Sequence, residues 1–337
     1  MPRVRSAAVL VFATLMLATG CAGQPAAQPG AGGGSTPTAP VASEPQPATE
    51  PVLPFGGDCA AILSTDEVAG FRGLAVDEPV RASDTVLGAG IESSGGLVCR
   101  WPVSGGYHGG LVVAAFPDAA VPDALREEHG GLTCAPVYDG YAACGSAETV
   151  DGTWLLTWTE LLTSDTAVDA PAGHAEAAAL IAERAAGQPA AAAATPADGW
   201  WSPAVCDGLA TALDLSALLG AGEVTAGSGT DAGHQIEVRI GATLPTYTIC
   251  EWSAGGSSVS VEIAPGGARA WDAVSAVAEQ PVQELTVAGT TRAVQTPGQQ
   301  LYPAVLLADD VNLARFAFTG SVDPEQFAAA LVGALAG

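Results

Sequence analysis

The sequence predicts an α+β protein made of two tandem repeats, each an antiparallel sheet packed with helices, behind a signal peptide and a disordered tether. Two matching cysteine positions indicate the repeat. A Cys precedes an apolar helical segment near the start of each half, at Cys59 and Cys206. Further along, each half has Cys-x-Trp at the end of a β-rich segment, in 99–101 and 250–252. Self-similarity of this kind is typical of duplicated folding units.

The same order of elements is expected in both halves: helix, two strands, helix, strands and a closing helix. Alternating β-branched residues predict the strands, and a 3.6-residue apolar period predicts the helices. Hairpin turns are expected at Asp151-Gly152 and Asp309-Asp310. In the first half the expected elements are helix 59–68, strands 97–101 and 111–113, helix 123–129, strands 141–144 and 153–158, and helix 171–185. In the second half they are helix 206–219, strands 248–252 and 259–263, helix 268–278, strands 302–307 and 311–318, and helix 324–335.

The N-terminus has the features of a lipoprotein signal. Arg3 and Arg5 precede an apolar run, 7–19, which is too short to cross a bilayer. The run ends in Leu-Ala-Thr-Gly-Cys, so we expect residues 1–20 to be removed and Cys21 to carry acyl chains, palmitate among them, that anchor the protein to the cell membrane on its extracytoplasmic face. A plain secretory signal with a coincidental Cys is the alternative.

Composition divides the remaining chain. Residues 21–53 consist of the acylated Cys and a Pro/Ala/Gly/Thr-rich tether, expected to be disordered. The first α+β domain is assigned to 54–187 and the second to 200–337. The linker between them, 188–199, contains an Ala run that could also form a frayed helix.

The charge is strongly negative. Without Arg3 and Arg5, nine arginines face 36 acidic residues, a formal charge of −27. Such a surface repels nucleic acid and anionic lipid, so we expect no nucleic-acid partner. An envelope protein or small ligand that is cationic or neutral is favoured, unless the charge serves solubility alone.

Seven cysteines in an exported chain, with one acylated, leave six for disulfides. Cys59 with Cys99 and Cys206 with Cys250 would then be equivalent bonds in the two repeats. Cys134 and Cys144 are left to each other across a short loop.

Together, the early Cys, the later Cys-x-Trp and the lipobox with its tether resemble the actinobacterial surface lipoproteins of a domain-of-unknown-function family, here in tandem. This resemblance implies a cell-surface binding or sensing role and carries over no catalytic residues. The first repeat departs from it by adding Cys134 and Cys144.

Motifs for chemistry are weak. The chain has no Lys, which excludes a Lys-dependent phosphate loop. The Gly-rich stretch 227–232 mimics a dinucleotide fingerprint but precedes what we expect to be a strand, 234–240, where that fingerprint needs a helix. We therefore expect no cofactor and no metal. Asp309, Asp310 and Asn312 could hold calcium, but hairpin chemistry explains them as well.

The four histidines, His108, His129, His174 and His234, are scattered and are expected on surfaces or turns. Glu127, Glu128 and His129 could bind a metal, although adjacent helical residues point in different directions, so a solvated helix end is favoured.

Side chains alternate between the two faces of a strand, and this alternation assigns most aromatic side chains to cores: Trp101, Trp154, Trp158, Trp252, Phe316 and Phe318. Tyr107 and His108 in a Gly-rich turn, and Trp200-Trp201 at the entry to the second repeat, have no such role and are the candidate binding residues. One of the two Trp residues could instead wedge between the repeats.

We expect a binding or sensing protein without catalytic activity. An accessory or scaffold subunit of an envelope complex, or an envelope hydrolase, is the alternative.

Overall fold

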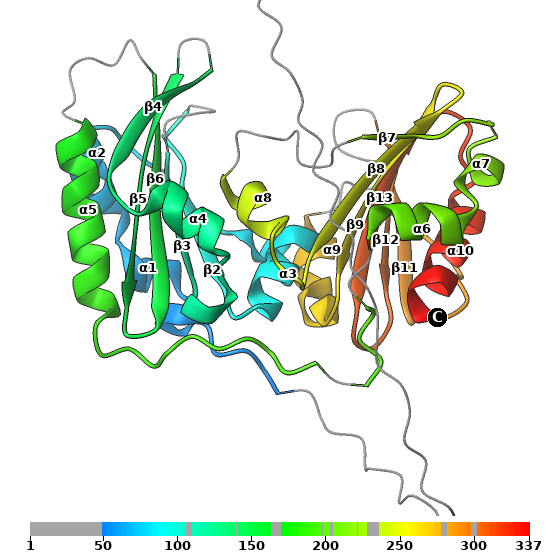
Figure 1. Ribbon diagram of the computed structural model, residues 1–337, viewed down its shortest axis with the longest axis horizontal. Helices are drawn as coiled ribbons and strands as arrows, with labels where there is room; N and C mark the ends of the chain where they lie inside the picture. Colours follow the sequence, from blue (N-terminus) through cyan, green and yellow to red (C-terminus); the bar gives the residue numbers. More distant parts are fainter. Residues whose placement is uncertain are drawn as a thin grey trace, which may run out of the picture. The chain divides into compact units, whose positions relative to one another are not determined.

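A computed structural model describes residues 49–105, 110–138, 141–162, 170–196, 198–202, 205–220, 222–227, 236–277, 282–297 and 302–337, all within one compact unit. They contain two antiparallel sheets with helices (Figure 1). The predicted α+β class with two tandem repeats is confirmed.

The first sheet has the strand order β1-β2-β3-β6-β5-β4. Figure 1 shows α5 lying along one face of it. The bounds of this half are α1 Cys59–Ile62, α2 Thr65–Arg72, β1 Val80–Arg81, α3 Val86–Ser93, β2 Leu97–Trp101, β3 Leu111–Pro117, α4 Asp123–His129, β4 Thr133–Tyr138, β5 Tyr141–Val150, β6 Thr153–Leu162 and α5 Ala170–Ala185.

The second sheet has the order β10-β11-β12-β13-β9-β8-β7. Helices α6 and α10 cover one of its faces (Figure 1). The bounds here are α6 Cys206–Leu213, α7 Leu215–Leu218, β7 Thr225–Gly227, α8 Ile236–Gly241, β8 Thr248–Ala254, β9 Ser257–Ala264, α9 Trp271–Ala276, β10 Gln283–Glu284, β11 Arg292–Thr296, β12 Ala304–Ala308, β13 Leu313–Thr319 and α10 Pro324–Ala336.

The two sheets have the same topology, because β7-β8-β9-β13-β12-β11 repeats the order β1-β2-β3-β6-β5-β4. Helix α3 corresponds to α8, α4 to α9 and α5 to α10 by their places between the strands. Only β10, a two-residue edge strand, lacks a counterpart in the described part of the first half. A position in one repeat can therefore be compared with its equivalent in the other.

Each sheet has two covered faces. The outer faces pack on helices of their own repeat, α1, α2 and α5 on the first sheet and α6, α7 and α10 on the second. The inner faces contribute to one hydrophobic cluster that contains residues of both repeats, from Val86 to Leu313. The ranges assigned to two domains thus share a core in the structure.

Helices α3 and α8 both contribute to the shared core, and they approach the other repeat closely. A Cβ on Gly90 of α3 would lie 2.7 Å from the Thr246 carbonyl oxygen, and one on Gly241 of α8 would lie 2.2 Å from Leu87. A side chain at Gly90 would collide with the backbone of the second repeat, whereas one at Gly241 would displace the end of the Leu87 side chain. Arg239 of α8 binds both carboxylate oxygens of Glu128 at 2.6 and 2.7 Å, and Arg100 pairs with Glu237.

Several local predictions were wrong or incomplete. The single helices expected at 59–68 and 206–219 are each divided in two, into α1 and α2 and into α6 and α7. The stretch 234–240 was expected to be a strand, yet Ile236–Gly241 is helical. Its alternating burial, which resembles a strand, arises because this short helix is covered on two sides. Helix α3 was not predicted at all. All eight of its residues are buried, so it has no amphipathic stripe for the sequence to show.

The three disulfides pair as predicted: Cys59–Cys99, Cys134–Cys144 and Cys206–Cys250. The first and third join the opening helix of each repeat to its Cys-x-Trp strand. Trp101 and Trp252, beside these two bonds, are buried, as predicted from the alternation of side chains along their strands.

The expected boundaries of the tether and the linker need correction. Val52 exchanges two backbone hydrogen bonds with Ala192, and Thr49 bridges Thr195. Residues 49–53 are therefore ordered by pairing with the linker, rather than forming the end of a disordered tether. The linker's Ala run is extended here, not helical.

Candidate functional site

The disulfide-bonded strands align the two repeats residue by residue. Cys99 lies opposite Val113 on β3, and Cys250 lies opposite Val261 on β9. Val113 is therefore equivalent to Val261. Continuing through the register, the pair Ala114–Leu156 is equivalent to Glu262–Arg315, and Val112–Trp158 is equivalent to Ser260–Ala317. All four pairs lie on the inner faces of the sheets. The pairs of the first repeat are apolar, whereas those of the second contain an ion pair and a Ser.

In the first repeat this inner position is filled. Trp158 lies over Gly145, where a Cβ would come within 2.8 Å of its ring. The ring of His129, the last residue of α4, packs edge-on against Trp158 with centroids 5.8 Å apart. Both side chains are buried. The Trp-His pair closes this part of the first sheet.

In the second repeat the same position is open. Ala317 replaces the Trp, and Ala304 stands where Gly145 lies beneath it. Val277, just after α9, replaces the His at the helix end. A cavity of about 240 Å³ lies beside Ala304 and Val277, lined by Asp84, Thr85, Val86, Glu262, Val274, Val277, Thr296, Ala304, Leu306 and Arg315. Repeat one supplies the first three of these residues, so the cavity lies between the repeats.

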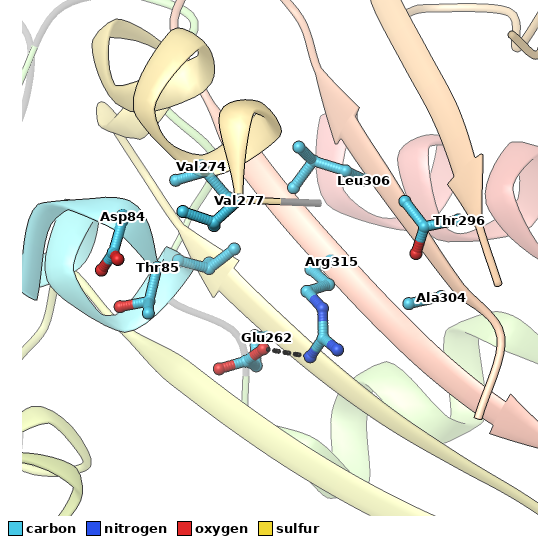
Figure 2. A pocket seen from close by; sticks show the side chains of 10 residues that line it. Asp84, Thr85, Glu262, Val274, Val277, Thr296, Ala304, Leu306 and Arg315 are labelled. Carbon is cyan, nitrogen blue, oxygen red and sulfur yellow. Dashed lines mark hydrogen bonds and ion pairs between the residues drawn. The ribbon is translucent and has the colours of Figure 1, made fainter. Parts of the chain in front are cut away.

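An ion pair forms the polar side of the cavity. Arg315 Nη1 donates to Glu262 Oε2 at 3.0 Å, and the Tyr247 hydroxyl donates to Glu262 Oε1 at 2.8 Å. Burial and the neighbouring Glu262 carboxylate raise the pKa of Tyr247, so its phenol remains a donor. Figure 2 shows the Glu262–Arg315 pair across from Val274, Val277 and Leu306. The cavity thus has one polar and one apolar side.

A second hollow of about 400 Å³ continues along the same sheet face. Its lining includes Ser260 and Ala317, which lie two residues along their strands from Glu262 and Arg315 and share their face. It also includes Tyr302, which is 52% exposed, and the polar side chains of Glu251, Ser253, Ser258 and Thr319. We call the cavity and this hollow together the inner trough.

Trp200 and Trp201, the described members of the candidate binding residues, do not line the inner trough. Tyr107 and His108 lie outside the described residues, as do Cys21 and His234. Trp201 is 3% exposed in the core of the second repeat, so its placement corrects the binding role expected for it. Trp200 is half-buried over Gly266, where a Cβ would lie 2.3 Å from its ring. Since Gly266 belongs to the second repeat, this contact packs Trp200 on its own repeat.

Asn312 holds the Trp200-Trp201 segment in place. Its side chain accepts from the Trp201 backbone N–H at 3.0 Å and donates to the Gly199 carbonyl at 2.7 Å. It also donates to Asp309, which caps the hairpin turn. This network accounts for Asp309 and Asn312, two of the three residues considered for calcium, as turn residues. Among the described residues, no group of three His, Cys, Asp or Glu side chains could hold a metal ion.

Two histidines are buried, not exposed as expected. His174 accepts or donates hydrogen bonds with Ser146 and Thr159 at 2.9 and 3.2 Å, and burial lowers its pKa to about 4. Among the described residues no carboxylate bonds His174, and this side chain is 3% exposed. Burial likewise lowers the pKa of His129. Both are packing residues.

Comparisons with known proteins give little. No family model matches the chain, and no curated protein matches it. One solved structure, described as the di-domain ARO/CYC StfQ from the steffimycin biosynthetic pathway, has 9% identity and a TM-score of 0.16 over 82% of this chain and 84% of that one. A score this low carries no argument. Within the described residues, no helix is long and apolar enough to span a bilayer.

Proposed function

We propose that this protein is a lipid-anchored extracytoplasmic binding protein, related to the surface lipoproteins it resembles, that takes a small ligand in the inner trough without catalysing a reaction. One observation carries this proposal: two repeats of the same fold differ at one inner position, which Trp158 and His129 fill in the first and which is open in the second. A structural role alone would be served equally well by the filled version.

The trough has the composition of a binding site. Small-molecule sites combine apolar walls with a few placed polar groups. Here Val274 and Leu306 form apolar wall, and Arg315 and Thr296 supply polar groups. Both oxygens of Glu262 accept hydrogen bonds within the protein, so this carboxylate is held as a structural group rather than poised as a general base.

The double variant Ala304→Gly/Ala317→Trp is expected to abolish ligand binding, because it rebuilds in the second repeat the plug found in the first. The Gly is needed since Ala304 Cβ would obstruct the ring, as a Cβ at Gly145 would. Wild type and variant should be compared by ligand-observed NMR with a panel of neutral and cationic small molecules. Ala304→Gly alone is the matched control and should bind as wild type does. Equal binding to the plugged variant, or no binding to wild type at millimolar concentration, would contradict the proposal.

Cys21→Ala is expected to move the chain from the membrane fraction to the released fraction, because acyl chains on Cys21 are its proposed sole attachment. Incorporation of labelled palmitate should disappear with it. The Cys134→Ala/Cys144→Ala pair is the control for loss of cysteine in general and should keep the label. A Cys21→Ala chain that still sediments with salt-washed membranes would refute the anchor.

A further inference from the structure

The hydrogen-bonding groups left over in the trough indicate what a ligand must offer, provided that the proposed function holds. Among the described residues, Arg315 has Glu262 as its only hydrogen-bond partner, which leaves the N–H groups of Nε and Nη2 for a ligand. Thr296 and Asp84 also line the cavity with no hydrogen-bond partner for their side chains in the described part of the chain. The site therefore offers donors and acceptors together.

The charges in the cavity favour a neutral ligand. Two carboxylates, Asp84 and Glu262, surround one guanidinium, Arg315, so an anion would gain one attraction and meet two repulsions. A cation would be attracted by Asp84 but repelled by Arg315, and Glu262 is already paired with that guanidinium. A neutral group that both donates and accepts, such as a hydroxyl, suits all three residues.

The opposite side of the cavity is apolar. Val274, Val277 and Leu306 lie across from the ion pair in Figure 2. A ligand ring with hydroxyls at its edge and C–H groups on its face would satisfy both sides. The volume of about 240 Å³ is below the range of drug-sized sites, which begins at ~300 Å³, so it suits a single ring.

The neighbouring hollow extends this chemistry. Ser253 and Ser260 have hydroxyls without a hydrogen-bond partner among the described residues. Tyr302 presents a half-exposed aromatic ring, whose face suits C–H groups and whose hydroxyl suits polar ones. Ser260 and Ala317 are the neighbours of Glu262 and Arg315 on the same face of the sheet, two residues along each strand. A second ring of a ligand bound in the cavity would therefore lie beside them on this face.

We propose that the inner trough binds a neutral oligosaccharide, with one sugar ring in the cavity above Glu262–Arg315 and the next on the hydroxyl-lined face beside Tyr302. Hydroxyls of the first ring bond Arg315 and Thr296, and its C–H face lies on the valines. The second ring stacks on Tyr302 and bonds Ser260.

Isothermal titration calorimetry tests this with maltotetraose, cellotetraose, xylotetraose and mannotetraose as neutral saccharides. Chitosan tetrasaccharide, tetragalacturonate and end-capped tetra-alanine serve as cationic, anionic and peptide probes of similar length. At least one neutral saccharide is expected to bind, with a longer chain binding more tightly than its monosaccharide.

Tyr302→Ala should weaken binding at least about fivefold, as expected for loss of an aromatic contact, while Tyr302→Phe keeps the ring and should stay within about twofold. Ser260→Val, which copies Val112 of the first repeat, should also weaken it.

The outcomes separate the two proposals. If only a charged probe or the peptide binds, and the Ala304→Gly/Ala317→Trp variant abolishes that binding, the trough is a binding site but the saccharide assignment is wrong. Saccharide binding that survives the plugged variant would also overturn the assignment, because the ligand would lie elsewhere. If neither these probes nor the small-molecule panel binds wild type, both proposals fail.

Discussion

Trp158→Ala is expected to lower the free energy of unfolding by about 3–5 kcal/mol, the usual cost of truncating a buried Trp. The ring is 9% exposed, lies over Gly145 and packs on His129, so its loss leaves a cavity in the shared core. Since that core joins both repeats, the whole molecule should be destabilised. Urea denaturation followed by circular dichroism measures the difference.

Tyr302→Ala is the matched control, because this aromatic side chain is 52% exposed and should cost less than about 0.5 kcal/mol. A Trp158→Ala protein as stable as wild type would show that the first repeat tolerates an open inner position, and that the plug is not a packing requirement. A change confined to the first repeat would instead show that the shared core does not couple the two.

Removing the Cys206–Cys250 disulfide by a double Ala substitution is expected to destabilise the protein by about 4 kcal/mol in the loop-entropy model. The bond closes a sequence separation of 44 residues and ties α6 to β8. The Cys59–Cys99 bond, with a separation of 40, should behave alike. Denaturation of the oxidised variants under non-reducing conditions gives the values.

Cys134–Cys144 provides the internal comparison. It spans 10 residues and joins β4 to its direct neighbour β5, so its loss should cost about 3 kcal/mol or less. Greater destabilisation from this short bond than from the long ones would show that strain or residual structure, rather than loop length, sets the stabilities.

The sequence by itself determined the elements whose signals are local or repeated. The hairpin at Asp151-Gly152, where both residues have positive φ, follows from turn chemistry between two alternating strands. The closing helix α10 begins at Pro324 with Asp323 capping it, as an Asp-Pro start predicts. The disulfides followed from duplication, because equivalent cysteines in two copies of one unit form equivalent bonds.

Tertiary structure alone decided how the two repeats meet. Helix α3 is buried on every side and α8 is a short helix covered on two, so neither has the amphipathic period from which a helix is predicted. The close approach of α3 to the second repeat depends on the missing side chain at Gly90, and an absent Cβ leaves no pattern in a sequence. The buried positions of His129, His174 and Trp201 likewise follow from neighbours distant in the chain.

The inner trough shows the same division. The substitution that opens it, Ala317 for Trp158, is visible once the repeats are aligned through their strand register. Without that register the residues lining the cavity are spread from Asp84 to Arg315, and nothing in their spacing connects them. A cavity is formed by side chains that fail to fill a space, and only the folded arrangement of both repeats defines that space.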